Sequence, residues 1–176
     1  MWAIVTDNEI TETFSNLKGL VIGDTQYSRN IFSSRWSEAE RNAIGVYTIE
    51  DDNSNRKDDS LYTNTDVSYA FADGKVTASY GTATPKELDD VKSQKKAIIK
   101  QEAGEILIKK DWYVIKATEV ESYSVPEAIT TYRADVRTAS NDMESKIDAC
   151  STVDELAALY VYTDGSRPLG EFPEAV

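Results

Sequence analysis

The sequence predicts an α+β protein made of a small antiparallel β meander in residues 1–84 and a helical hairpin or bundle with a C-terminal tail in residues 85–176. Two observations support this prediction. Short apolar runs separated by turn dipeptides fill the first half, which is typical of antiparallel strands. Apolar residues at helical spacing fill the second half, and the change falls at Gly81-Thr82-Ala83-Thr84-Pro85.

Two turn dipeptides in the first half predict β-hairpins. Asp7-Asn8 and Asp73-Gly74 each lie between runs rich in strand-forming residues, and both pairs tolerate the positive φ angles of a tight hairpin turn. Ser37, followed three residues later by Glu40, predicts the N-cap of a short helix that Gly45 ends. The first half is therefore expected to be an antiparallel meander interrupted by one helix.

Four helical segments are expected in the second half. Thr84 as N-cap and Pro85 at the first position predict the start of the first helix. Its apolar stripe comprises Leu88, Val91, Ile98, Ile99, Ala103 and Ile106. Asp111 could cap a further segment, and Val125-Pro126-Glu127 opens a helix whose apolar face comprises Ile129, Tyr132, Val136, Ala139, Met143 and Ile147. Thr152 then caps a last short helix, and the chain from Asp164 onward is predicted to be a tail.

The charge balance is acidic throughout and argues against nucleic acid as a partner. Residues 1–84 contain 13 Asp and Glu against 7 Lys and Arg, and the remainder contains 18 against 12, for a formal net charge of −12. Nucleic-acid binders need a basic footprint on their surface. No apolar run approaches the length of a membrane span, and the N-terminus lacks the pattern of a signal peptide. We therefore predict no nucleic-acid partner, no membrane contact and residence in a reducing cytoplasm.

The chain contains no histidine, which excludes most catalytic machinery. Ser-His-Asp and Cys-His sites and His-ligated metals are ruled out. Gly19, Gly23 and Gly45 are too far apart for a phosphate-binding loop, and the paired carboxylates fall where acidic residues favour helix starts. The sequence predicts a protein that is not an enzyme and has no cofactor.

Three smaller features each have two interpretations. Asp51, Asn53 and Asn55 match the first calcium ligands of an EF-hand loop, but the required glycine and final glutamate are absent, so a solvated loop without metal is favoured. Cys150 is interpreted as a small apolar residue at a helix end rather than a reactive thiol. Trp112, Tyr113 and Tyr132 suit either a core or an exposed binding patch, and periodicity does not separate these alternatives.

A resemblance to a known family rests on three motifs. Asp111-Trp112, then Val125-Pro126-Glu127, then Tyr132-Arg133 followed by Arg137 occur in this order. This order resembles the C-terminal region of bacteriophage tail-fibre assembly proteins, also called tail assembly chaperones, over about residues 86 to 160. The first half, with Trp36-Ser37-Glu38 before Ala43-Ile44-Gly45-Val46, is similar to N-terminal modules of small tail proteins from marine phages.

The resemblance implies a non-enzymatic chaperone that binds a trimeric phage tail fibre in the host cytoplasm and aids its folding, trimerisation or capping. The implied partner-binding residues are Trp112, Tyr113, Tyr132, Arg133 and Arg137. Many family members carry a Trp-Pro element close behind the Tyr-Arg helix, and this chain has Leu156-Ala157-Ala158-Leu159-Tyr160 instead. That departure keeps open an alternative, a permanent structural or adaptor protein of the virion tail bound to the fibre.

Overall fold

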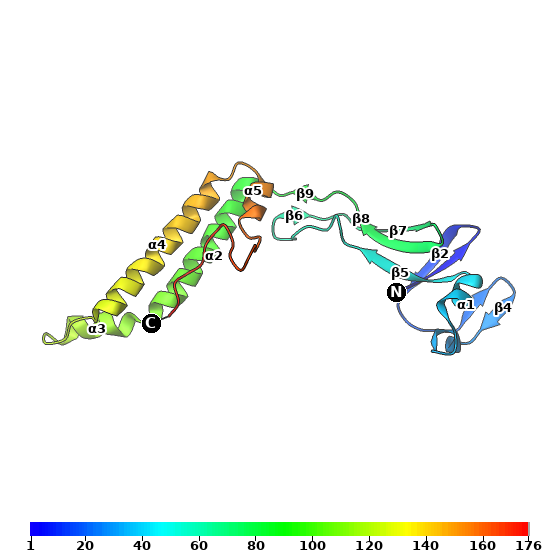
Figure 1. The fold of residues 1–176 in the computed structure, drawn as a ribbon, viewed down its shortest axis with the longest axis horizontal. Helices are drawn as coiled ribbons and strands as arrows, with labels where there is room; N and C mark the ends of the chain where they lie inside the picture. The colour runs from blue at the N-terminus through cyan, green and yellow to red at the C-terminus, as the bar shows by residue number, and fades with distance from the viewer. Residues whose placement is uncertain (176) are drawn as a thin grey trace. The chain divides into compact units, whose positions relative to one another are not determined.

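The computed structural model describes residues 1–175 and is an α+β fold, 39% helical and 24% strand, as the sequence predicts. The last residue of the predicted tail, residue 176, lies outside the described range. A curled N-terminal β-sheet is followed by C-terminal helices (Figure 1). The chain forms two compact units, which are named here the β unit (1–59 and 63–84) and the helical unit (60–62 and the described chain from 85 onward).

The β unit is built on a five-stranded sheet in the order β2-β1-β5-β8-β7. Its strands are β1 (Trp2–Thr6), β2 (Glu9–Phe14), β5 (Val46–Asp52), β7 (Val67–Ala72) and β8 (Lys75–Tyr80). Both predicted hairpins are present: Asp7 and Asn8 have φ of 52° and 66° between β1 and β2, and Asp73 and Gly74 have 52° and 73° between β7 and β8. The prediction of a purely antiparallel meander is wrong, because β5 and β8 pair in parallel.

The two faces of this sheet bury separate apolar clusters. Ala3 and Val5 of β1 point to one face, where they pack with residues from β5 and β8. Ile4, between them in sequence, points to the other face, as the two-residue period of a strand requires. This second face is covered by β3 (Leu20–Ile22), β4 (Thr25–Tyr27), the 3₁₀-helix η1 (Arg29–Phe32) and α1 (Glu38–Ala43).

The short helix α1 begins and ends as its sequence predicts. The Ser37 amide donates to Glu40 Oε2 at 2.7 Å and the Glu40 amide donates to Ser37 Oγ at 3.2 Å, which completes a capping box. These bonds from Ser37 lower the pKa of Glu40. Gly45 follows the helix with φ of 82°, and a Cβ there would lie 2.5 Å from the Val5 carbonyl oxygen, so only glycine fits.

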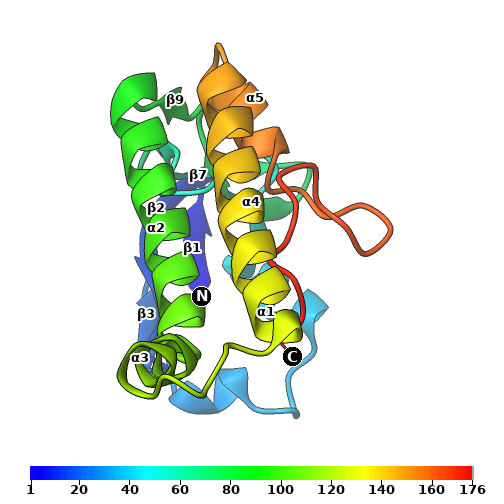
Figure 2. The same cartoon turned by 90° about the vertical axis from the view of Figure 1, so that its left-hand side faces the viewer.

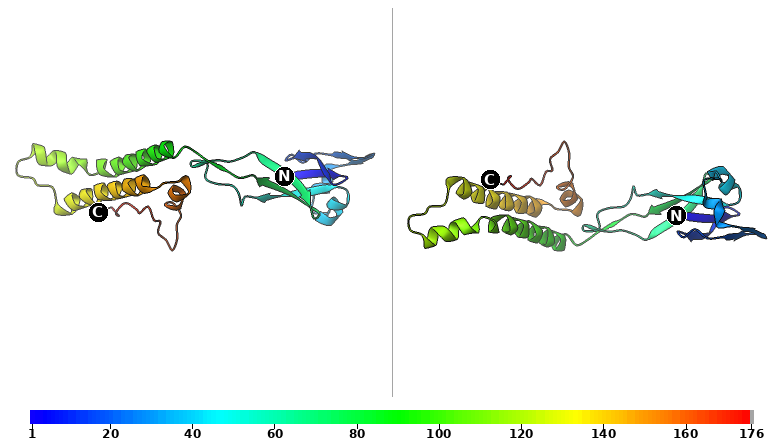
Figure 3. Two further views of the ribbon diagram at one scale, coloured as in Figure 1. Left: turned by 90° about the horizontal axis from the view of Figure 1, so that it is seen from above. Right: turned by 90° about the horizontal axis from the view of Figure 1, so that it is seen from below.

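The helical unit consists of α2 (Leu88–Ile108), α3 (Asp111–Glu119), α4 (Glu127–Ala149) and α5 (Val153–Ala158). The long helices α2 and α4 lie side by side and run in opposite directions (Figures 2 and 3). The buried face of α4 is the predicted one except that Ser140 is buried in place of Ala139. On α2, Ile98 belongs to the predicted apolar stripe but is 49% exposed. Cys150 ends α4 and is buried, and Thr152 caps α5, both as predicted.

The predicted start of the first long helix is wrong. Thr84–Pro85 forms the short strand β9, which pairs with β6 (Tyr62–Thr63), and α2 begins at Leu88 without a side-chain cap. The amide of Lys86 donates to the Leu61 carbonyl at 3.0 Å, which holds this segment extended. Residues 60–62, expected in the first module, belong to the helical unit, where Leu61 and Tyr62 are buried.

The segment predicted to be a tail packs against the helical unit. Leu169 is fully buried, and its amide donates to the Leu159 carbonyl at 3.0 Å. Lys146 Nζ of α4 donates to the carbonyls of Pro168 and Leu169 at 2.8 and 3.0 Å. Phe172 packs on the cluster of Ala103, Tyr132 and Val136. The reason is apolar burial: Leu169 is withdrawn from water and Phe172 covers the cluster between α2 and α4, while Lys146 satisfies the carbonyls of Pro168 and Leu169.

Candidate interaction surface

The helix α3 is the least buried helix of the helical unit. It follows α2 after a break at Lys109-Lys110, and none of its residues is buried. Asp111, predicted as a possible cap, is its first helical residue, and the N-cap position is taken by Lys110. A nine-residue helix is marginal by itself in water. It therefore depends on contacts with the rest of the unit at its start.

One arginine of α4 supplies that contact. Arg133 Nη1 lies 2.7 Å from Asp111 Oδ1 and donates to the Leu107 carbonyl at 2.8 Å. The Leu107 carbonyl belongs to the last turn of α2 and also accepts the Lys110 amide at 3.0 Å; carbonyls at this end of a helix attract cations. Arg133, whose side chain is 12% exposed, thus joins the end of α2, the start of α3 and the body of α4.

The α3 surface is defined here as Ile108, Trp112, Val114, Ile115 and Val120, all apolar and all exposed. Trp112 is 52% and Ile115 54% exposed. The Trp112 and Tyr113 rings pack against each other with centroids 4.1 Å apart. Lys116 Nζ lies 5.6 Å from the Trp112 ring centroid and 4.3 Å from that of Tyr123. Several large apolar side chains left exposed on one short segment are typical of interaction sites.

The five residues implied as partner-binding by the resemblance fall into different places. Trp112 is on the exposed α3 surface and Tyr113 is half-buried beside it. Tyr132 is 6% exposed and lies in the core with Ala103 and Val136. Arg133 is engaged inside the unit, and Arg137 is exposed and donates to the Arg133 carbonyl of its own helix at 3.2 Å. The structure thus brings Trp112 and Tyr113 together and directs the other three inward or along α4.

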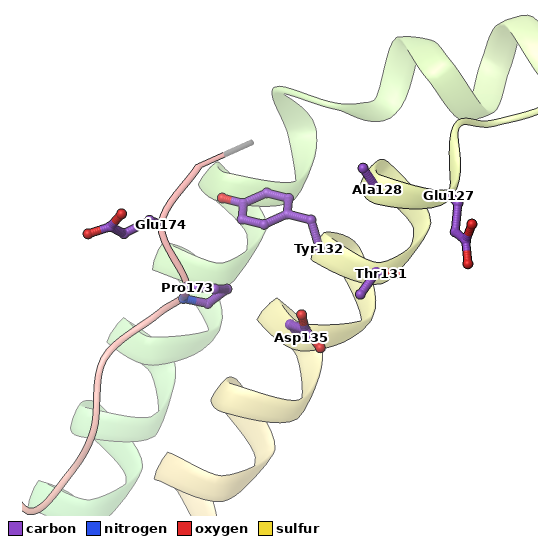
Figure 4. Close-up of a pocket in the computed structure, with 7 residues that line it drawn as sticks. All are labelled: Glu127, Ala128, Thr131, Tyr132, Asp135, Pro173 and Glu174. Atoms are coloured by element: carbon purple, nitrogen blue, oxygen red, sulfur yellow. The ribbon is translucent and has the colours of Figure 1, made fainter.

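A groove of about 430 Å³ opens beside the first turns of α4 (Figure 4). The α4 groove, as it is called here, is lined by Glu127, Ala128, Thr131, Tyr132 and Asp135 of α4 and by Pro173 and Glu174 of the C-terminal segment. Sequence reasoning missed this groove. Its acidic residues lie at helical spacing near a helix start, but the other wall comes from a segment predicted to be a tail.

The loop with the partial calcium pattern uses its side chains to stabilise its own turns. Asp52 Oδ1 accepts a hydrogen bond from the Ser54 amide at 2.9 Å, which lowers the pKa of Asp52. Asn55 Nδ2 donates to the Tyr80 carbonyl at 3.1 Å. Within residues 1–175, no three His, Cys, Asp or Glu side chains are grouped so that they could hold a metal ion. The solvated-loop interpretation accounts for these contacts.

Cys150 has the surroundings of an unreactive thiol. It is buried at the end of α4, and its Sγ lies 3.4 Å from the Lys146 carbonyl. Burial, together with the charge of Glu155, raises the pKa of Cys150. A raised pKa leaves less of the nucleophilic thiolate at neutral pH.

Comparisons with known protein families, curated proteins and solved structures found no match to this chain. Among the described helices, none is long and apolar enough to cross a membrane.

Proposed function

We propose that this chain is a non-enzymatic assembly chaperone that binds a bacteriophage tail fibre through the α3 surface. The observation that carries the proposal is that α3 buries none of its residues and leaves Trp112 and Ile115 more than half exposed. Tryptophan is among the commonest anchors of protein interfaces. An exposed helix with an apolar face is also a common shape for docking onto an apolar surface of a partner.

The physical task of such a chaperone suits this surface. Fibres are long trimers whose non-local β-pairing is slow, and their unpaired edges are prone to aggregate before assembly. A small partner that covers apolar fibre surface with its own apolar residues would suppress that aggregation. The net charge of −12 would keep the complex soluble.

The motif resemblance supports the same partner. Its two most separated parts, Asp111-Trp112 and Tyr132-Arg133, are joined by the Asp111–Arg133 ion pair. This contact fixes the first turn of α3, and with it the position of Trp112. A defined position for an exposed tryptophan is what a specific docking geometry requires.

The test is co-expression with a phage tail-fibre protein, chosen by searching for a long, repetitive fibre gene beside the gene for this chain. We expect the intact chain to raise the yield of soluble fibre trimer, measured by gel filtration and by resistance to SDS without boiling. Trp112→Gln and Ile115→Gln are expected to remove most of that gain. Ile98→Gln, at a position on α2 of similar exposure (49%), is the matched control and is expected to keep it.

Equal fibre yield with and without the chain would refute the proposal. If Ile98→Gln lowers the yield of soluble fibre trimer as much as Trp112→Gln does, the α3 surface is not the docking site. Because all three positions are exposed, the substitutions are expected to change the free energy of unfolding by no more than about 0.5 kcal/mol. Circular dichroism on each variant separates lost docking from lost folding.

The C-terminal segment favours a second candidate, a permanent component of the virion tail. This chain lacks the Trp-Pro element of the tail-fibre assembly proteins, and its C-terminal segment packs on its own helical unit, where Leu169 is buried and Lys146 of α4 donates to the carbonyls of Pro168 and Leu169. Mass spectrometry of washed virions distinguishes the two roles. Stoichiometric amounts in the particle would favour the permanent component, and absence would favour the transient chaperone.

A further inference from the structure

The five-stranded sheet of the β unit has two edge strands, and only one of them is protected against pairing with another chain. The β2 edge carries Glu9 and Glu12, and the register of its pairing with β1 shifts between Ile4 and Val5. Charged side chains and bulges are common means of keeping an edge strand from pairing with another molecule. The β7 edge has neither: Val67–Ala72 contains no charged residue and no proline, and it pairs with β8 in one unbroken register.

The turn that ends β7 determines which of its backbone groups face outward. The two-residue turn Asp73-Gly74 has positive φ at both positions, so the residues on either side of it exchange backbone hydrogen bonds with each other. Alternation along the strand then directs the backbone N–H and C=O groups of Val67, Tyr69 and Phe71 away from β8. Within residues 1–175, these groups have no hydrogen-bond partner, because β7 is the last strand of the sheet.

The side chains of β7 are also open to solvent. Five of its six residues are exposed, and among them Val67 and Tyr69 are each 37% exposed. The curl of the sheet brings β2 near β7, but β2 neither pairs with this strand nor covers these two side chains. Val67 and Tyr69 share the face of Phe71, which packs on the apolar cluster around Val76. A strand added at this edge would therefore extend an existing apolar face.

We propose that the β7 edge pairs with the β7 edge of a second copy of this chain, so that the two sheets join across a two-fold axis. Antiparallel pairing satisfies all the outward backbone groups when Val67 lies opposite Phe71 of the second copy and Tyr69 lies opposite Tyr69. Pairs of aromatic and β-branched residues are favourable across antiparallel strands. On the other face of the sheet, the small residues Ser68 and Ala70 lie opposite each other. Such a contact uses the same patch on both copies and closes on itself as a dimer.

The distribution of charge allows two acidic copies to meet at this edge. Each chain carries a net charge of −12, and like charges directly opposite each other destabilise a strand pair. In the register described above, β7 contributes no charge, and Asp66 just before it lies opposite Ala72 of the second copy. The remaining repulsion between the copies is long-range and is screened by salt. The dimer is therefore expected to be weak and to become stronger as the ionic strength rises.

The test is sedimentation velocity of the full chain over a range of protein concentrations and at two ionic strengths. We expect the weight-average sedimentation coefficient to rise from the monomer value towards the dimer value with concentration, and the dissociation constant to fall when salt is added. Hydrogen exchange locates the contact. The amides of Val67, Tyr69 and Phe71 are expected to exchange more slowly at high protein concentration than at low concentration.

Two variants test the strand pairing itself. Val67→Pro removes one outward N–H from each copy at the first position of β7, where a proline leaves the pairing with β8 in place. It is expected to weaken dimerisation about five- to a hundredfold, because one hydrogen bond is lost from each copy. Val67→Thr keeps the N–H and the β-branched shape and is the matched control. The double variant Ser68→Lys/Ala70→Glu, at two exposed positions, places opposite charges across the axis and is expected to strengthen dimerisation about two- to tenfold.

Several results would overturn the proposal. These are a sedimentation coefficient that does not change with concentration, equal dimerisation of Val67→Pro and Val67→Thr, and a double variant that dimerises no more tightly than the unsubstituted chain. A dimer that is lost in Trp112→Gln and kept in Val67→Pro would also overturn it, because the contact would then lie on the α3 surface. The proposed function is independent of these outcomes, since its test measures the yield of soluble fibre trimer.

Discussion

Replacing Arg133 by glutamine tests whether this residue, rather than apolar packing, holds α3 to the rest of the helical unit. The substitution removes the hydrogen bond to the Leu107 carbonyl at 2.8 Å and the ion pair with Asp111 at 2.7 Å. A hydrogen bond from a charged group contributes about 1.5 to 3 kcal/mol. Asp111 is 44% exposed, so the ion pair adds at most about 1 kcal/mol. We expect Arg133→Gln to lower the free energy of unfolding by about 2 kcal/mol.

The assay is urea unfolding followed by far-UV circular dichroism. Asp111→Asn keeps a hydrogen-bond acceptor and loses the charge, so its expected cost is about 0.5 to 1 kcal/mol. The matched control is Arg137→Gln, one turn further along α4, where the side chain is exposed and bonds only its own helix; its cost is expected within about 0.5 kcal/mol. If Arg133→Gln costs no more than Arg137→Gln, the account of how α3 is anchored is wrong.

Three further predictions concern the rest of the chain. Leu169→Ala is expected to cost about 3 kcal/mol of unfolding free energy because its side chain is fully buried, whereas exposed Val161→Ala should cost less than about 0.5 kcal/mol. Gly45→Ala should destabilise the β unit by about 1 to 3 kcal/mol, since φ is 82° and the new Cβ would meet the Val5 carbonyl; thermal unfolding checks this. The pKa of Cys150 is raised. A disulfide reagent should therefore react with Cys150 more slowly in the folded protein than in the denatured protein between about pH 7 and 9, and the reaction rate of the folded protein should still be rising at the alkaline end of this range.

Local signals in the sequence were reliable where a residue acts on backbone groups close to it along the chain. Asp7-Asn8, Asp73-Gly74 and the Ser37–Glu40 capping box form the predicted turns and helix start. The same reasoning failed at Thr84-Pro85, where a good helix-start signal lies in a short strand. A tertiary hydrogen bond, from the Lys86 amide to the Leu61 carbonyl, outweighs the local preference there.

The candidate interaction surface was only partly foreseeable. Aromatic residues at helical spacing suit both a core and an interface, and the structure separates them: Tyr132 is buried while Trp112 is half exposed. Periodicity records which residues share a helix face but not which faces meet a neighbour. The α4 groove depends on the packing of Pro173 and Glu174 beside α4, about 40 residues away in sequence, and no local pattern reports such a contact.

The sequence by itself determines the α+β class, the order of most strands and helices, the acidic surface and the absence of histidine chemistry. These properties follow from composition and from short-range backbone preferences. Tertiary structure alone decides that β5 and β8 pair in parallel, that the chain around Leu169 belongs to the helical unit, and that α3 buries none of its residues. Each of these depends on contacts between residues far apart along the chain, where burial of apolar surface and pairing of polar groups outweigh local preference.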